Sequence, residues 1–407
     1  MNNSLKKKIS IIFSDSVCSI TALVIMNVVA QFAVYPFWAM QFGAEYYGDI
    51  LYLLSFINIF SVSIGLGMNF ARLADSAKIE TKNGEYHVIL LIACVLGAPF
   101  SWGVQKLAAV SMSQNEFLIF WLLLCFTMWR NYADVDFRLG LNYKGYFKYY
   151  CAVSIGYLFG IVLCYFIGIW ELSLLVGEVT GILYVFLKGD NLRRNSFQFS
   201  EESRATIESC MILVGTHFIM NLIFNADRFV LKAFISGTAV TIYYLSSLMG
   251  KTVSLITTPL NSVIISYLAK YKGGFSWKMY CRMLLIIGVA SVIMVIGCVV
   301  GSYILIPVLY PESFEMTKEF FWISSVSQVF FFATSVLMVV LLRFAKQRYQ
   351  LYINVVYAIV FLVLGIPMTK SGGIWGFSYA ILFANVSRMI VTIGFGVLDQ
   401  RQRRKSV

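Results

Sequence analysis

Residues 207–235, IESCMILVGTHFIMNLIFNADRFVLKAFI, decide the fold class, because this stretch is long and apolar and yet carries charged residues inside it. It exceeds the roughly 20 residues that a helix needs to cross a bilayer. A charge at the centre of a spanning helix costs roughly 2.5–3.5 kcal/mol on insertion scales, so it usually faces a polar interior. The stretch therefore predicts a membrane-spanning helix whose Arg228 binds an anion.

Similar apolar stretches fill the rest of the chain. Of its 407 residues, 59% are hydrophobic and only 13% are charged, which excludes a soluble globular protein of this length. About twelve stretches have the length of a bilayer crossing, and short polar segments separate them. The sequence predicts an all-α polytopic membrane protein with about twelve transmembrane helices.

The net charge of +12 is distributed over short loops in the way that membrane topology demands. If the N-terminus lies inside, 25 of the 32 Lys and Arg residues fall on the inner side, with Arg72 and Arg130 counted among the inner loops. This pattern predicts two cytoplasmic termini and an even number of spans. It argues against nucleic acid as a partner.

The chain also shows signs of an internal repeat. A shift of 194 residues aligns Asn27 with Asn221, Gly43 with Gly237 and Tyr86 with Tyr280. The polar segment 188–204 lies between the sixth and seventh spans and is the natural boundary. We predict two six-helix lobes, residues 1–194 and 195–407, related by a pseudo-two-fold axis along the membrane normal and facing a central cleft.

Polar residues recur at helical spacing in several spans and predict the lining of that cleft. In residues 207–235 they share one arc about 80° wide if the helix is continuous: His217, Asn221, Asn225, Arg228 and Lys232. Other spans carry Asn58 with Asn69, Lys251 between serines, and Asn385 with Arg388. Lys232 lies near the outer end of its span and is equally consistent with a side chain that reaches the interface.

Each of these residues has a structural alternative. Isolated Ser, Thr and Asn side chains often hold helices together by hydrogen bonds. For Arg228, Lys251 and Arg388 we favour anion binding. Glu178, between two glycines in the sixth span, and Asp227 are candidates for ion coupling, and the alternative for both is an ion pair with a neighbouring cation.

Sequence motifs of enzymes are missing. The eight cysteines show no metal-ligand spacing, and only two histidines are present, so we predict no metal, no cofactor and no catalytic residues. Gly250-Lys251-Thr252 matches only the end of a phosphate-binding loop. A transporter of this composition would draw its energy from a gradient or from removal of its solute.

Three motifs carry a resemblance to a known family. Residues 43–49, GAEYYGD, precede Gly65-Leu66-Gly67, residues 225–229, NADRF, precede Tyr243-Tyr244, and residues 309–314, LYPESF, follow the ninth span. Together they resemble the motifs of bacterial O-antigen and polysaccharide repeat-unit flippases, the Wzx type. These are the polysaccharide transporters of the multidrug/oligosaccharidyl-lipid/polysaccharide (MOP) exporter superfamily.

The resemblance implies a MATE-like, V-shaped fold in the bacterial inner membrane and a role in lipopolysaccharide biosynthesis. It implies translocation of an undecaprenyl-pyrophosphate-linked oligosaccharide to the periplasmic leaflet by alternating access. Arg228, Lys251 and Arg388 would then hold the diphosphate, and Asn58, Asn69, Asn221 and Asn225 would face the glycan. A polysaccharide polymerase and a chain-length regulator are the implied protein partners.

Two other functions stay open. A multidrug or cation antiporter of the same superfamily would need an acidic or aromatic cavity, whereas the predicted cavity is basic. A membrane enzyme of the O-antigen polymerase type would need a long outer loop with catalytic basic residues, whereas the outer loops here are short.

Overall fold

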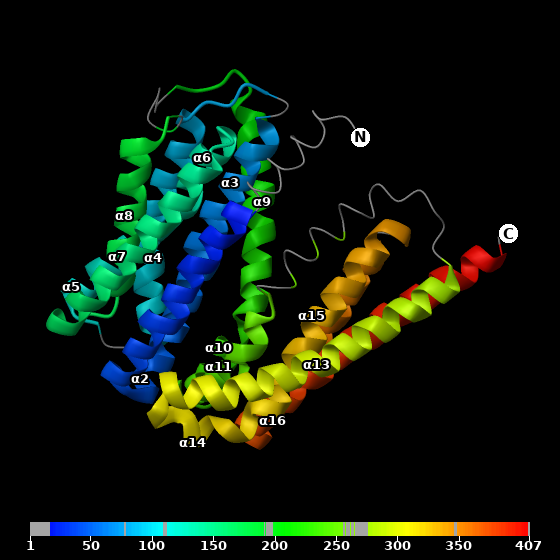
Figure 1. Cartoon of the computed structure of the whole chain (residues 1–407). Coiled ribbons are helices and arrows are strands. Elements are labelled where there is room, and N and C mark those ends of the chain that lie inside the picture. The colour runs from blue at the N-terminus through cyan, green and yellow to red at the C-terminus, as the bar shows by residue number, and fades with distance from the viewer. Residues whose placement is uncertain are drawn as a thin grey trace. The chain divides into compact units, whose positions relative to one another are not determined.

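The computed structural model contains only helices and connecting segments in the residues that it describes: 17–76, 79–108, 112–190, 192, 198–254, 257, 261, 264, 276–345 and 348–405. By packing, the chain divides into two compact units, Met1–Arg228 and Phe229–Val407. Figure 1 labels the helices of both units.

In the described part of the chain, seven helical segments are long and apolar enough to cross a membrane, and two of them are too long for one crossing. Val17–Asp75 has 59 residues and Tyr349–Arg401 has 53, whereas one crossing needs about 20. The first breaks at Gly43 (φ 77°) and the second at Gly373 (φ 57°), a left-handed conformation that glycine adopts readily because it has no Cβ. The chain is a multi-pass, all-α membrane protein, as its composition predicts.

The first unit consists of helices that pack along much of their length. Its elements are η1 (Ala30–Val34), α2 (Tyr35–Ile57), η2 (Asn58–Val62), α3 (Ser63–Asp75), α4 (Gly84–Ala108), α5 (Gln114–Ala133), α6 (Val135–Leu139), α7 (Tyr143–Ile167), α8 (Leu172–Lys188) and α9 (Ser203–Phe224). The most extensive contacts join α7 to α8 and α3 to α9, and Figure 1 shows both pairs side by side.

Small residues explain why α7 and α8 approach so closely. Gly156 and Gly160 lie one turn apart on α7, where Gly156 faces Gly177 of α8 and Gly160 faces the backbone of Ser173. A Cβ atom at Gly156 would lie 2.5 Å from the Cα atom of Gly177, a distance that real side chains do not adopt. In lipid, where hydrophobic burial does not drive helices together, such close backbone packing is a principal source of association.

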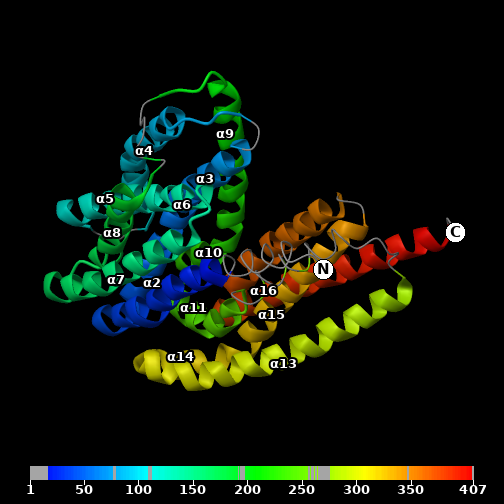
Figure 2. The ribbon, with the colours of Figure 1, turned by 45° about the horizontal axis from the view of Figure 1, so that its top comes forward.

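The second unit is built on three long helices. α10 (Ala226–Phe234) begins at the end of the first unit, and α11 (Gly237–Thr252), α13 (Trp277–Leu309), η3 (Pro311–Ser313), α14 (Phe314–Thr317), η4 (Lys318–Phe320), α15 (Phe321–Phe344) and α16 (Arg348–Lys405) follow. α15 packs against α11, α13 and α16. Figure 2 shows α13, α15 and α16 extending along this unit.

Packing groups α9 with the first unit, whose last residue is Arg228. The division into six-helix lobes at residue 194 rests on the sequence repeat and the topology, and it stays a prediction.

Candidate functional site: buried cations in each unit

The polar stripe predicted on residues 207–235 does not follow one continuous helix. α9 ends at Phe224 and α10 begins at Ala226, because Asn225 leaves the helical conformation with φ −103° and ψ 5°. Its side-chain amide donates to the carbonyl of Asn221 at 2.8 Å, which stabilises the end of α9. The single 80° arc is therefore wrong beyond Asn225. Arg228 lies in the first turn of a new helix.

Arg228 is half-buried in the first unit, and three of its hydrogen bonds go to neutral oxygens. Its Nη1 donates to the side-chain oxygen of Asn225 at 3.0 Å, to Ser55 Oγ at 3.2 Å and to the carbonyl of Leu51 at 3.4 Å. The carboxylate of Asp227 accepts the backbone N–H of Arg228 at 2.9 Å, as an acid at a helix N-terminus commonly does. These hydrogen bonds orient the guanidinium of Arg228.

Arg388 is the most deeply buried of the predicted anion-binding cations, with 7% of its surface exposed. Its Cζ atom lies 4.4 Å from the ring centre of Phe331 and 5.5 Å from that of Tyr357, so two aromatic faces flank the guanidinium. Its Nη2 donates to Asn354 Oδ1 at 3.4 Å, a long hydrogen bond. α15 and both halves of α16 contribute to this environment.

No carboxylate pairs with Arg388 among the residues that the structure describes, and its Nε–H has no hydrogen-bond partner there. A buried cation without a counter-ion is costly, and aromatic rings replace only part of the lost hydration. An anion bound beside Arg388 would offset this cost. The geometry is that of a cationic site that lacks its own acidic partner.

Lys251 lies in the last turn of α11 and is partly buried. Its Nζ atom is 5.5 Å from the ring centre of Tyr244, about two helical turns earlier on α11. Lys251 and Arg388 thus belong to the second unit, while Arg228 belongs to the first. Lys232 lies on α10, in the last turn.

The predicted glycan-facing asparagines have different environments. Asn58 begins η2, and its carbonyl accepts Ser63 Oγ at 3.3 Å, while the Asn221 amide donates to the same Ser63 Oγ at 2.9 Å. Both asparagines are partly exposed. Short π-helical segments such as η2 are frequent at functional sites. Ser63 thus links two of the predicted residues within the first unit.

Asn69 is fully buried and lies in a polar network between α3 and α5. Its amide donates to Asp134 Oδ1 at 2.5 Å and to the carbonyl of Asn131 at 3.1 Å, and its oxygen accepts Arg138 Nη1 at 2.9 Å. Asn225 is also buried, with 2% of its surface exposed. This geometry favours helix packing for Asn69, and its role in glycan contact stays a prediction.

Glu178 forms a buried ion pair with Arg130 in the first unit. Arg130 Nε lies 2.6 Å from Glu178 Oε2, and Tyr157 donates to Glu178 Oε1 at 2.7 Å. Arg130 lies within α5 with 6% of its surface exposed, so its assignment to an inner loop was wrong, and the same applies to the buried Arg72 in α3. The pairing favours the structural alternative for Glu178, and ion coupling stays a prediction.

Sequence reasoning missed Glu171, which precedes α8 in the connection from α7. Only 1% of its surface is exposed, and neither carboxylate oxygen meets a side-chain donor among the described residues. Burial, together with the negative charge of Glu116, raises the pKa of Glu171 from 4.5 to about 8. The preceding residue, Trp170, is bulky and apolar, which is a sequence signal of this burial.

The described part of the chain holds no cluster of His, Cys, Asp and Glu residues that could bind a metal ion. Chemically, the buried groups offer cations, amides and hydroxyls. These groups can bind an anionic or a hydroxyl-rich solute.

The long apolar helices define a multi-pass membrane protein with an all-α fold and buried cations. Solved structures share this fold. The lipid II flippase MurJ in an inward closed conformation matches with a TM-score of 0.71 at 12% identity, over 94% of this chain and 87% of that one. An inward-facing multidrug resistance MATE transporter of the MOP superfamily matches with a TM-score of 0.69 at 13% identity, over 96% and 100%. The Vibrio cholerae MATE transporter VcmN in the bent form matches with a TM-score of 0.61 at 10% identity, over 99% of each chain.

These likenesses establish the fold, which is the one that the sequence motifs implied. No family model matches the chain, and no curated protein matches it.

Proposed function

We propose that this protein is a transporter of the MOP superfamily that moves a lipid-linked oligosaccharide across the bacterial inner membrane by alternating access. Its substrate is an undecaprenyl-diphosphate-linked repeat unit of the O-antigen type, carried from the cytoplasmic to the periplasmic leaflet. The two termini are cytoplasmic, and the protein works beside a polysaccharide polymerase and a chain-length regulator. Export of lipopolysaccharide precursors is the resulting role.

One observation carries this proposal: the buried guanidinium of Arg388, which has no carboxylate partner among the described residues. A diphosphate that crosses a membrane needs fixed cations, because hydrocarbon cannot replace its hydration. Arg228 and Lys251 supply further cations, and Arg228 donates hydrogen bonds to neutral oxygens. The fold shared with a lipid II flippase supports the same conclusion.

The amide groups of the chain suit the carbohydrate part of this substrate. Asn58 and Asn221 are partly exposed, so their side-chain amides could exchange hydrogen bonds with sugar hydroxyls. We assign these two residues to the glycan first, with Asn69 and Asn225 as supporting residues. Catalysis plays no part in this mechanism.

The test uses a deletion strain of the bacterium that encodes the protein. Loss of the chain should remove surface polysaccharide and leave lipid-linked repeat units in the inner leaflet. An Arg388→Ala variant should lower export about 10- to 100-fold, because a hydrogen bond to a charged group contributes about 1.5–3 kcal/mol. Arg388→Lys should retain part of the activity.

Arg72 provides the matched control, because it is also buried and its Cζ atom lies 5.1 Å from the ring centre of Tyr86. Arg72→Ala should lower protein yield and leave export per molecule unchanged. Unpolymerised units outside the cell would indicate a polymerase instead. Drug sensitivity with normal polysaccharide would indicate a multidrug antiporter.

A further inference from the structure

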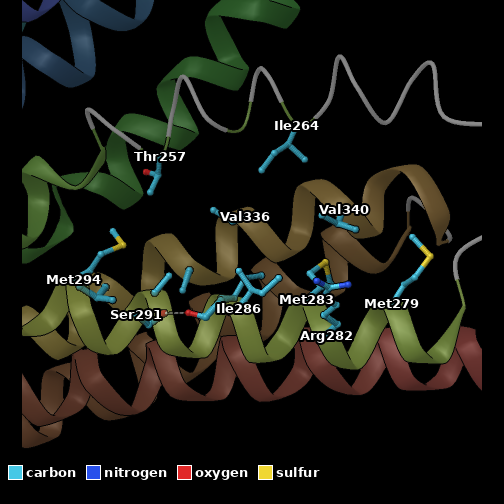
Figure 3. A pocket seen from close by; sticks show the side chains of 14 residues that line it. Thr257, Ile264, Met279, Arg282, Met283, Ile286, Ser291, Met294, Val336 and Val340 are labelled. Atoms are coloured by element: carbon cyan, nitrogen blue, oxygen red, sulfur yellow. Dashed lines mark hydrogen bonds between the residues drawn. The ribbon is translucent and has the colours of Figure 1, made fainter.

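The second unit contains an apolar groove that the cationic site does not use. Figure 3 shows its lining residues on α13 and α15, together with Thr257 and Ile264. Its volume is about 510 Å³. The groove is formed within one unit and is therefore a feature of that unit's own packing.

The lining of the groove is almost wholly hydrocarbon. α13 presents one face at intervals of three and four residues, from Met279 to Met294, and α15 contributes the corresponding face from Val329 to Val340. Ser291 donates to the carbonyl of Ile287 at 2.7 Å, so its hydroxyl is already satisfied. A polar solute would find few partners here, so the groove suits a hydrocarbon chain.

Methionines make this lining adaptable. Met279, Met283 and Met294 line the groove from α13, and Figure 3 shows all three beside it. The unbranched thioether side chain has three rotatable bonds and fills irregular space around ligands of varied shape. A branched, flexible chain is the kind of ligand that such a surface accommodates.

Among the described residues, one charged side chain lines the groove. Arg282 lies near the start of α13, its side chain is exposed, and the other described residues that line the groove are uncharged. A ligand that fills the groove thus meets a cation at one end, where a phosphate would be attracted to it. The charge is complementary to a lipid with a phosphorylated head.

The length of the groove distinguishes the lipids that could fill it. Arg282 and Met294 are twelve residues apart on α13, which corresponds to about 18 Å of helix. A second apolar groove of about 550 Å³ shares Ser291 and Val329 and continues along α13 to Ile296. Half of a bilayer's hydrocarbon core is about 15 Å thick. A lipid chain that fills both grooves therefore extends past the bilayer midplane. An acyl chain of one leaflet does not extend that far.

We propose that these two grooves hold the polyprenyl chain of the substrate, with Arg282 receiving its diphosphate at the membrane surface. The inference rests on the proposed function and adds a binding site for the lipid part of the substrate. Arg388 then acts on the diphosphate after the chain has docked.

The experiment measures lipid binding to the full-length protein in phosphatidylcholine nanodiscs by native mass spectrometry. The probes are undecaprenyl diphosphate, undecaprenol and dioleoylphosphatidylglycerol. Ala290→Trp places a large ring in the groove, while Val289→Trp places the same ring on the neighbouring exposed position, which lines neither groove. Equal yield and thermal stability of the two variants control for folding.

Ala290→Trp should weaken binding of undecaprenyl diphosphate about tenfold or more, equivalent to loss of contact with about two methylene groups, and Val289→Trp should not. Arg282→Ala should weaken undecaprenyl diphosphate about fivefold and leave undecaprenol unchanged. Equal binding by both tryptophan variants would overturn the proposal. So would displacement of the polyprenyl lipid by an equal amount of phosphatidylglycerol.

Failure of the groove and failure of the proposed function have different signatures. If deletion of the protein stops export while Ala290→Trp exports and binds normally, only the groove proposal is wrong. If the wild-type protein binds no undecaprenyl diphosphate and deletion leaves export intact, the proposed function is wrong.

Discussion

Removal of the Glu178 carboxylate should destabilise the first unit more strongly than any other single loss of a hydrogen bond there. Glu178 lies 2.6 Å from Arg130 Nε, and the two side chains are 3% and 7% exposed. Tyr157 donates to the other carboxylate oxygen at 2.7 Å. Glu178→Leu would therefore leave a buried cation and a buried hydroxyl without their acceptor.

The magnitude follows from this geometry. Removal of one member of a buried ion pair costs about 3–5 kcal/mol, because the other charge stays in a medium of low polarity. Tyr157→Phe removes only a hydrogen bond to a charged group and should cost about 1.5–3 kcal/mol. The double variant Arg130→Met with Glu178→Leu should recover much of the stability, since no uncompensated charge remains.

The assay is reversible unfolding in mixed micelles with increasing denaturing detergent, measured for the wild type, both single variants and the double variant. Transport by the same variants is measured in parallel and corrected for folded protein. If Glu178→Leu is as stable as the wild type but has lost transport, Glu178 acts in ion coupling and the structural reasoning is refuted. A double variant less stable than either single one would also contradict it.

Two further predictions concern the same unit. Burial raises the pKa of Glu171 from 4.5 to about 8, so the folded state keeps a proton that the unfolded state releases between these values. The free energy of unfolding should thus fall by up to about 5 kcal/mol as the pH rises through this window. Glu171→Gln should abolish that pH dependence. If the variant and the wild type show the same pH profile of thermal unfolding, the prediction is contradicted. Gly156→Val should separate α7 from α8 and cost about 2–3 kcal/mol through overpacking, whereas the same change at Gly215, where a Cβ atom meets nothing within 4 Å, should be nearly neutral in detergent unfolding.

Some features of the site could be predicted from local sequence. Arg228, Lys251 and Arg388 are conspicuous because a charge within an apolar run is unusual whatever its partners are. The structure adds the partners: neutral oxygens for Arg228 and two aromatic rings for Arg388. Ser55, Phe331 and Tyr357 lie far in sequence from the cations that they contact, so no local pattern could identify them.

Other features depended on helix ends and packing. Helical phase assumed that residues 207–235 form one helix, and the break at Asn225 invalidates that phase for Arg228. Arg130 resembled a loop cation because it follows an apolar run, yet its ion pair with Glu178 stabilises it inside the bundle. Contacts between distant segments decide whether a charge at the end of a span is exposed or buried.

The sequence by itself determined that this protein is a multi-pass, all-α membrane protein, because hydropathy and span length are local properties that the bilayer itself enforces. Tertiary structure alone decided which buried polar groups have a hydrogen-bond or ion-pair partner. Glu178 finds a cation, and Arg388 finds no carboxylate among the described residues. The physical reason is that the cost of burying a charge depends on its neighbours in space, which helix packing selects.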